Sequence, residues 1–380
     1  MNTNSTLGIY IHIPFCRSKC LYCDFYSIPA AKEEAIERYV DALCRHIEYM
    51  GGQADGRTVD SVFIGGGTPT VMNVGQFGRV CSSLEKGFSL SFDCEFTVEA
   101  NPATFDVDKV AALRLMGVNR LSIGMQSANA EELRLLGRAH RMEQVKTAVD
   151  AVNLGGIDNF NLDLMYGIPS QTVESFGETL ELAKSLSPSH ISVYGLQLEE
   201  GTPLFRRQDR YVFPDEDAER DMNRLADSVL GEAGYNRYEI SNYALHGREC
   251  RHNLRYWFRE DYIGLGAAAH SFSDGVRYFA PDSIEEYVSA INAENYRAVQ
   301  LCRQVIDGDE AVNEYIMLRM RLATGISPEE FLRDTGKSFE AYEKLMQPFI
   351  HSGHIAHENG RYFFTPDGFD VSNYILARII

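Results

Sequence analysis

The segment GIYIHIPFCRSKCLYCDF occupies residues 8–25 and carries the most informative pattern of the chain. It opens with a short apolar run, Gly8–Ile13, rich in isoleucine, which is typical of a buried strand. Three cysteines follow within eight residues, at positions 16, 20 and 23. Thiolates are the ligands that iron–sulfur clusters take. The segment therefore predicts a strand that leads directly into an iron–sulfur site.

Similar apolar runs recur up to about residue 245 and alternate with helical patterns, the first of which covers residues 32–50. This alternation predicts parallel strands joined by crossovers, in a partial barrel or a doubly wound sheet. In both folds ligands gather at the carboxyl ends of the strands, where the cysteines lie. The predicted strands are Gly8–Ile13, Val59–Ile64, Glu95–Val98, Arg120–Ile123, Asn161–Leu164 and His190–Tyr194.

The pattern changes from residue 309 onward. The predicted elements there are helices over 311–323, from 327 and over 339–351, then a hairpin of 353–355 with 361–365. Asn359-Gly360 is a strong signal for the hairpin turn. Three helices and a hairpin resemble a winged helix. We therefore expect a barrel domain over 1–245, a connecting segment over 246–305, and a C-terminal α+β domain over 306–380.

Composition and charge exclude several classes of protein. The net charge of −18 argues against a general nucleic-acid binder and disfavours tight electrostatic attachment to an anionic membrane. No apolar run is long enough to cross a bilayer, and the N-terminus lacks the pattern of a secretory signal. The cysteines outside positions 16–23 are scattered, unlike a disulfide framework. We expect a reducing, cytoplasmic compartment.

The spacing Cys16-x3-Cys20-x2-Cys23 provides three thiolates, whereas clusters usually take four. The next cysteine, Cys44, lies on the apolar face of a predicted helix. Three ligands on a four-iron cube would leave one iron open, as a catalytic zinc keeps an open position. The alternatives are a structural zinc site, with His12 as a possible fourth ligand, or three core cysteines. The position after the first strand of a βα repeat favours the cluster.

The cysteine motif resembles that of the radical S-adenosylmethionine superfamily. The residues YIHIPFC, 10–16, narrow the resemblance to its branch of coproporphyrinogen III dehydrogenases and heme chaperones. The resemblance covers nearly the whole chain and implies a partial (β/α)6 barrel, a 4Fe–4S cluster and S-adenosylmethionine. In this branch the cofactor's amino and carboxylate groups chelate the open iron. One electron from the cluster then splits the sulfonium into methionine and a 5′-deoxyadenosyl radical.

Several residues near the predicted strand ends match cofactor-binding positions of that branch. The glycine run 65–67 allows close backbone approach, although alone it also fits an ordinary turn. Arg138 offers a fork suited to a carboxylate, and Asp163 can accept hydrogen bonds from ribose hydroxyls. Each residue alone would more often be a surface charge, a cap or a core aromatic. The resemblance implies cofactor contacts at Tyr10, Tyr22, Gly66, Gly67, Thr68, Glu99, Gln126, Arg138 and Asp163.

Three features place the chain closer to the heme chaperones. The dehydrogenases carry a further cysteine where this chain has Phe25, and they have a long extension where only fifteen residues precede Cys16. In addition, HNLRYW at 252–257 matches the HNxxYW signature of the chaperone group. Neutral imidazole is a good axial iron ligand, so His252 is the candidate heme ligand; the alternative is that it caps a loop. Cys250 is expected to be a small buried residue.

The resemblance implies a protein that binds heme as cargo and transfers it to acceptor hemoproteins, with an electron donor for the cluster. The alternative is an oxygen-independent coproporphyrinogen III dehydrogenase, an oxidative decarboxylase of porphyrin biosynthesis. Whether the chain acts as an enzyme is left open at this point. Peripheral membrane association and a homodimer are further expectations. Nucleic-acid binding through the winged-helix-like tail is a minor hypothesis.

Overall fold

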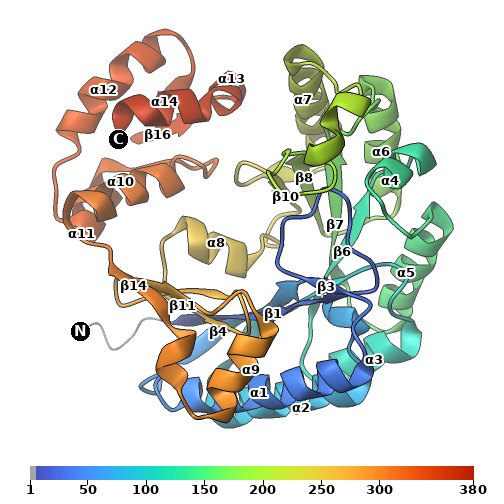
Figure 1. Ribbon diagram of the computed structural model, residues 1–380. Coiled ribbons are helices and arrows are strands. Elements are labelled where there is room, and N and C mark those ends of the chain that lie inside the picture. Colours follow the sequence, from blue (N-terminus) through green and yellow to red (C-terminus); the bar gives the residue numbers. More distant parts are fainter. Residues whose placement is uncertain (1–5) are drawn as a thin grey trace.

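A twelve-stranded sheet forms the centre of the computed structural model, which describes residues 6–380. Its strand order is β14-β13-β12-β11-β1-β4-β5-β6-β7-β8-β10-β9 (Figure 1). The six middle strands, from β1 to β8 in this order, pair in parallel and follow the order of the chain. They are β1 Leu7–Ile13, β4 Thr58–Gly66, β5 Ser89–Ala100, β6 Arg120–Gln126, β7 Asn159–Tyr166 and β8 His190–Gly195. The predicted partial (β/α)6 barrel is confirmed.

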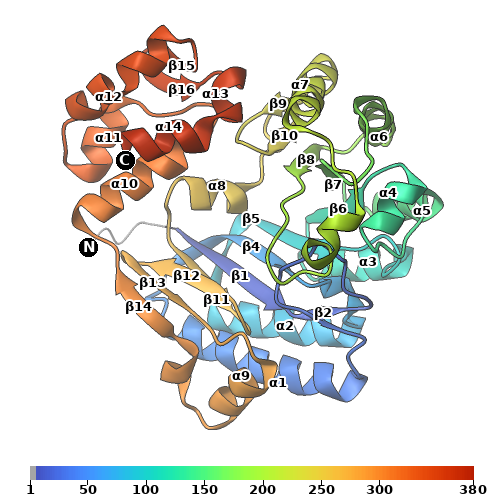
Figure 2. The ribbon, with the colours of Figure 1, turned by 45° about the horizontal axis from the view of Figure 1, so that its top comes forward.

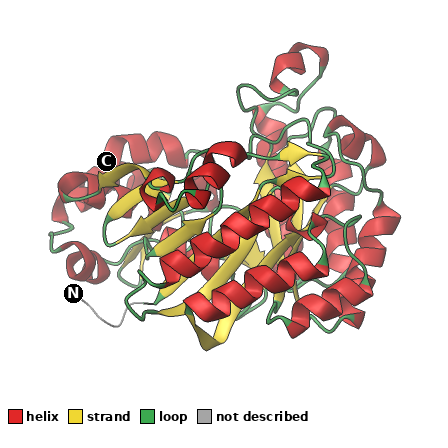
Figure 3. Ribbon diagram, turned by 60° about the horizontal axis from the view of Figure 1, so that its bottom comes forward, coloured by secondary structure: helices red, strands yellow, loops and turns green. Residues whose placement is uncertain are grey.

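Helices follow these strands and cover the outer face of the sheet (Figure 3). The first, α1, spans Glu33–Gly51, close to its prediction, and buries its apolar positions at helical spacing. The second begins at a capping box formed by Asn73 and Gln76. The remaining helices and turns are α2 Val74–Gly87, α3 Val107–Leu115, α4 Ala130–Leu135, α5 Met142–Leu154, α6 Val173–Ser185, α7 Glu216–Glu232, η1 Pro69–Val71 and η2 Phe205–Arg210.

Helix α8, Arg251–Trp257, differs from all of these because it lies on the inner face of the sheet. Figures 1 and 2 both show it across β1 and β4 from α1 and α2. Two of its side chains, His252 and Arg255, are buried against β4. This helix brings the HNxxYW motif into the hollow of the partial barrel.

Residues 262–305, predicted to connect two domains, continue the sheet. Strand β11 pairs in parallel with β1, so that β1 lies inside the sheet, and the strands beyond it are antiparallel. At the other end β10 and β9 add two short antiparallel strands beside β8. The elements are β11 Tyr262–Leu265, β12 His270–Ser273, β13 Val276–Phe279, α9 Ile284–Asn292, η3 Tyr296–Val299, β14 Leu301–Val305, β10 Asn242–Ala244 and β9 Asn236–Arg237. A two-stranded pair, β2 Phe15–Cys16 and β3 Ile28–Pro29, brackets the cysteine loop.

The C-terminal residues form a smaller unit with its own apolar core. The three predicted helices and the hairpin are present, and Asn359 and Gly360 both adopt the positive φ that a tight hairpin turn requires. Two short helices after the hairpin were not predicted. The elements are α10 Gly308–Arg319, α11 Pro328–Thr335, α12 Glu340–His351, β15 Ile355–Glu358, β16 Arg361–Phe364, α13 Pro366–Asp370 and α14 Ser372–Ile379.

The junction between the barrel and the C-terminal unit contains a buried acid. The Ala323 N–H donates to the Tyr238 carbonyl (3.0 Å), and the next residue, Glu239, forms a bridge with Leu322. Glu239 is 1% exposed, and its Oε1 has no hydrogen-bond partner. Burial raises the pKa of Glu239 to about 7.

In residues 6–380 no helix combines the length and apolar character needed to cross a membrane.

Candidate functional site

The three cysteines lie on one loop at the carboxyl end of β1. Cys16 ends β2, and Cys20 and Cys23 follow in the loop; all three are half-buried free thiols. The Thr68 hydroxyl donates to the Cys16 sulfur at 3.6 Å. Burial raises the pKa of the Cys23 thiol to about 11. A thiolate there needs a positive charge beside it, which a bound metal supplies.

This donor set fits an iron–sulfur cluster. The three thiols line one cavity and come from a single loop. No three His, Cys, Asp or Glu side chains in residues 6–380 are grouped so that they could hold a metal ion. The thiolates of a four-iron cube bind three different iron atoms, so they need not converge on one point. The remaining five cysteines are also free thiols.

The cavity beside the cysteines has a volume of about 400 Å³, and we call it the cofactor cavity. Eight of the nine predicted cofactor contacts line it, from the ends of β4, β5, β6 and β7 and from two loops. Their arrangement follows from strand geometry, because every second residue of a strand points to the same face. These lining residues are Tyr22, Gly66, Gly67, Thr68, Glu99, Gln126, Arg138 and Asp163. The ninth, Tyr10, lies on a neighbouring cavity described below.

Glycine is required where β4 meets the cysteine loop. Gly66 has a φ of 108°, and a Cβ there would lie 2.4 Å from the His12 ring. A Cβ on Gly67 would lie 2.6 Å from the Phe15 carbonyl oxygen. Both contacts are too close for any side chain, so the glycine run lets β4 end directly against the loop that carries the cysteines.

Two acids face each other at the bottom of the cofactor cavity. Glu99 accepts the Gly66 N–H at 3.0 Å, and burial followed by the charge of Asp163 raises the pKa of Glu99 to about 7. Asp163 accepts from Asn161 (2.7 Å) and Ser122 (3.2 Å), and burial also raises its pKa. These acceptors suit hydroxyl and ammonium groups of a bound ligand.

Arg138 supplies positive charge to the same cavity. Its guanidinium lies over the Tyr22 ring at 5.9 Å, and its Nε is buried without a hydrogen-bond partner. A Cβ on Gly124 would lie 2.8 Å from Nη2, so that glycine makes room for the side chain. An unpaired guanidinium in a cavity fits a ligand carboxylate.

A second cavity of 220 Å³ lies deeper in the barrel, and we call it the inner chamber. It shares Phe25, Gly66, Glu99, Ser122, Asp163 and Tyr194 with the cofactor cavity, so the two adjoin. On β6, β7 and β8 the inner chamber begins two residues nearer the amino end of the strand, at Arg120, Asn161 and Ser192. Its further lining residues are Tyr10, Phe63, Arg120, Asn161, Ser192, His252, Asn253 and Tyr256.

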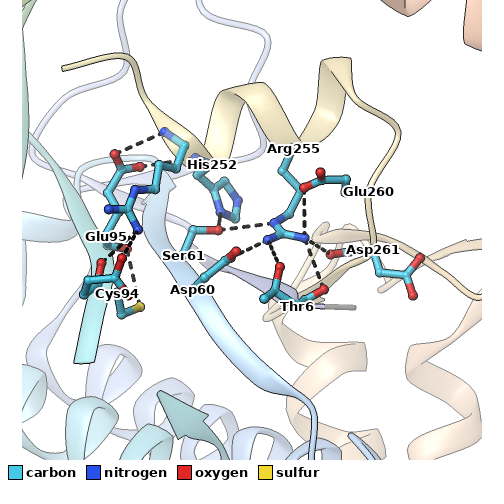
Figure 4. Close-up of polar contacts among 11 residues, drawn as sticks. Thr6, Asp60, Ser61, Cys94, Glu95, His252, Arg255, Glu260 and Asp261 are labelled. Atoms are coloured by element: carbon cyan, nitrogen blue, oxygen red, sulfur yellow. Dashed lines mark hydrogen bonds and ion pairs between the residues drawn. The ribbon is translucent and has the colours of Figure 1, made fainter. Parts of the chain in front are cut away.

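The predicted heme ligand, His252, lines this inner chamber and is 1% exposed. Its Nδ1 lies 3.0 Å from the Ser61 hydroxyl and its Nε2 lies 2.9 Å from the Tyr256 hydroxyl (Figure 4 shows the contact with Ser61). Its backbone N–H donates to Glu95 at 3.2 Å. Burial lowers the pKa of the imidazole to about 3, so the ring is neutral. Both ring nitrogens are therefore already engaged within the protein.

Many of the lining residues were not predicted, among them Ser122, Tyr194 and Arg120. Ser122 and Tyr194 lie on β6 and β8 and contact both cavities. Tyr194 lies one residue before the end of β8, so the rule that ligands gather at strand ends identifies it. Arg120 lies at the beginning of β6, where no local pattern marks it. Cys250, predicted as a small buried residue, is buried and donates to Glu95 at 3.4 Å.

Comparisons with known families agree with this geometry. A family model described as the radical SAM superfamily matches residues 10–183, and one described as the HemN C-terminal domain matches residues 306–371. Three curated relatives bear the name heme chaperone HemW. The Escherichia coli protein is 35% identical over 92% of this chain and 91% of its own length. The Lactococcus lactis protein is 31% identical, covering 98% and 96%, and the Bacillus subtilis protein is 31% identical, covering 98% of each.

Among solved structures, the chain resembles coproporphyrinogen III oxidase (HemN) from Escherichia coli, described as a radical SAM enzyme. The TM-score is 0.86, and the match covers 99% of this chain and 90% of that chain at 24% sequence identity. At this identity the similarity concerns the fold, including the mixed sheet and the small C-terminal unit.

Proposed function

The chain belongs to the radical SAM superfamily and, within it, to the HemW family, and from this membership we propose that it is a heme chaperone. In this proposal it binds heme as cargo and passes it to acceptor hemoproteins. The observation that carries the proposal is the identity of 31–35% with heme chaperones along nearly the whole chain. The HNxxYW motif, predicted as the mark of that group, adds to it because it lies beside the cofactor cavity.

We propose that Cys16, Cys20 and Cys23 hold a 4Fe–4S cluster and that the cofactor cavity binds S-adenosylmethionine. Arg138 would bind the cofactor's carboxylate, while Glu99 and Asp163 would accept from its amino and hydroxyl groups. When bound, the cluster and its cofactor supply one-electron chemistry at the sulfonium. Tyr10 lines the inner chamber and not the cofactor cavity, so its predicted contact with the cofactor would lie where the two cavities adjoin.

An electron donor for the cluster and the acceptor hemoproteins are the partners that this function requires. Peripheral association with a membrane and a homodimer stay predictions. The acceptors are defined by chemistry: proteins that need heme and bind it more tightly than the chaperone does.

The test uses the full chain with its cluster reconstituted under anaerobic conditions. The protein is titrated with heme and then mixed with an apo-globin, and heme absorbance is followed in each. We expect stable heme binding and transfer that is faster from the protein than from free heme of the same concentration. A chain that takes up no heme, or that never releases it to the globin, would contradict the proposal.

A second candidate is oxygen-independent oxidative decarboxylation of coproporphyrinogen III. It is favoured by one observation: eight cofactor contacts and three cysteines line a single cavity, as a functioning radical site requires. The anaerobic assay supplies S-adenosylmethionine, a reductant and coproporphyrinogen III. Formation of decarboxylated porphyrinogen would support this candidate, whereas cleavage of the cofactor with unchanged coproporphyrinogen would exclude it.

A further inference from the structure

Arg120 is a fully buried charge without a direct ion pair: burial lowers its pKa, but the charges of neighbouring groups, Glu95 and Asp163 among them, outweigh burial and raise the pKa overall. Arg120 lies at the first position of β6, is 2% exposed, and its Nε has no hydrogen-bond partner. None of the ion pairs among residues 6–380 includes it. Its side chain lines the inner chamber beside Asn161 and His252. The charge of Arg120 is thus compensated by neighbouring groups, while no carboxylate of the described residues pairs with it directly.

One acid near Arg120, Glu95, has other hydrogen-bond partners. Glu95 accepts the backbone N–H groups of Arg251 (3.1 Å) and His252 (3.2 Å) with its two oxygens, and thus caps the start of α8 (Figure 4). The Cys250 thiol also donates to it at 3.4 Å. The two oxygens of Glu95 are therefore engaged at the start of α8; its charge still acts on Arg120, but it forms no ion pair with the guanidinium, which lines the chamber.

The chamber also contains two carboxyl groups, Glu99 and Asp163, whose ionisation burial disfavours: burial raises the pKa of both, that of Glu99 to about 7. Neither forms an ion pair with Arg120, and Asp163 accepts instead from Asn161 and Ser122. His252 is neutral, because burial lowers its pKa. The amide of Asn253 is a further polar group in the wall. Arg120 is thus the one fully charged cation among the lining residues that the structure describes.

The size of the chamber limits what can enter. Its 220 Å³ lies below the roughly 300–1,000 Å³ that drug-sized ligands occupy, so a porphyrin macrocycle does not fit. A short acidic side arm fits. The chamber adjoins the cofactor cavity, which S-adenosylmethionine fills in our proposal, and it shares Tyr10, Phe25 and Tyr256 with a further cavity of about 410 Å³. An arm inside the chamber therefore belongs to a ligand whose body lies on the side of that further cavity.

We propose that the inner chamber is a carboxylate-binding subsite in which Arg120 pairs with one propionate arm of the porphyrin cargo. This inference rests on the proposed heme function and adds the group by which the cargo is recognised. It also assigns a role to the HNxxYW motif: His252, Asn253 and Tyr256 form one wall of the subsite rather than supplying the ligand to iron. Guanidinium and carboxylate form charge-assisted hydrogen bonds, which are strongest in such buried sites.

The experiment compares iron protoporphyrin IX with its dimethyl ester, in which both propionates are uncharged. Binding of each to the cluster-loaded chain is measured for wild type, Arg120→Met, Arg120→Lys and a control, Arg57→Met. Arg57 is less deeply buried than Arg120 and pairs with Asp261 at 2.5 Å, and it does not line the chamber. We expect wild type, the Lys variant and the control to bind the free acid at least tenfold more tightly than the ester. We expect Arg120→Met to bind both equally.

Thermal unfolding separates binding from folding. Arg120→Met takes away a cation that the surrounding acids stabilise, so binding is compared only on variants that still unfold in one cooperative transition above the assay temperature. The comparison of acid and ester on wild type tests the subsite whether or not the variant folds. Equal binding of acid and ester by wild type, or a tenfold preference retained by Arg120→Met, would overturn the subsite.

Failure of the heme function gives a different result. If wild type binds neither porphyrin, the heme proposal falls, and sodium propionate alone then tests the chamber. A rise in melting temperature with propionate in wild type but not in Arg120→Met would keep the carboxylate subsite. An equal response of the two proteins to propionate would overturn it.

Discussion

The Nδ1 atom of His252 lies 3.0 Å from the hydroxyl oxygen of Ser61, which joins residues 191 positions apart in the chain. Ser61 is on β4, and its side chain points to the inner face of the sheet, where α8 lies. The imidazole is thereby held between the strand and Tyr256 of its own helix. The histidine of the HNxxYW motif is a structural link between α8 and the barrel.

We expect His252→Gln to lower the free energy of unfolding by about 1–3 kcal/mol, because a buried partner loses its hydrogen bond. We also expect the variant to keep the position of the heme Soret band, since both ring nitrogens are engaged within the protein. Urea denaturation and absorbance spectroscopy measure the two effects. A displaced Soret band in a folded variant would assign His252 as the axial ligand of the iron.

Replacing Cys16, Cys20 or Cys23 by Ala should each abolish the cluster, because a cube held by two thiolates is lost. The measurement is bound iron per chain after anaerobic reconstitution, together with the charge-transfer absorbance of the cluster. Cys302→Ala is the matched control, since Cys302 is an exposed free thiol on β14. Retention of iron by all three variants would show that the ligand assignment is incorrect.

Arg138→Met should weaken binding of S-adenosylmethionine at least tenfold, because a ligand carboxylate loses its only guanidinium partner in the cofactor cavity. The free energy of unfolding without ligand should not fall, since the Nε of Arg138 has no partner to lose. Equilibrium dialysis with the cluster-loaded protein measures the affinity. Arg134→Met is a control, because Arg134 lies on α4 in an exposed pair with Glu131. Unchanged affinity in the Arg138 variant would exclude this role.

From the raised pKa of Glu239 we predict that the stability of the fold depends on pH. This pKa is about 7 in the folded chain and 4.5 when unperturbed, so between these values the folded state binds more protons. Stability contributed by the protonated acid is fully present below pH 4.5 and is lost as pH rises through 7. Glu239→Gln should therefore be more stable than wild type by about 3 kcal/mol at pH 8 and equal to it near pH 4.5. Parallel stability curves of the two proteins would contradict this.

The parallel core could be predicted from the sequence because its strands are buried on both faces and therefore read as apolar runs. All six predicted strands lie within β1, β4, β5, β6, β7 and β8. The strands from β11 to β13 have four residues each and include polar residues such as His270 and Ser273. In runs this short the alternation of apolar and polar residues is not clear, so the sequence does not predict these strands. Their position beside β1 depends on tertiary contacts.

The candidate site, like the sheet, has a part that the sequence predicts and a part that it does not. The cysteines and the glycine run are local patterns, and the cofactor cavity brings them together with eight of the nine predicted contacts. Arg120 could not be predicted, because its significance arises from what surrounds it: Glu95 on β5, committed to a helix that begins more than 150 residues later. A buried charge has no signature in the sequence around it.

The position of β1 has a consequence for how the chain is made. Although β1 precedes the other described strands in the chain, it lies inside the finished sheet, with β4 on one side and β11 on the other. Its β4 edge can pair early, but its second edge stays open until residues 262–265 have left the ribosome. Open strand edges are where nascent chains aggregate, and late long-range pairing slows folding. The loop that follows β1 carries the three cysteines, so the cluster site adjoins a strand whose second edge is paired only by residues 262–265.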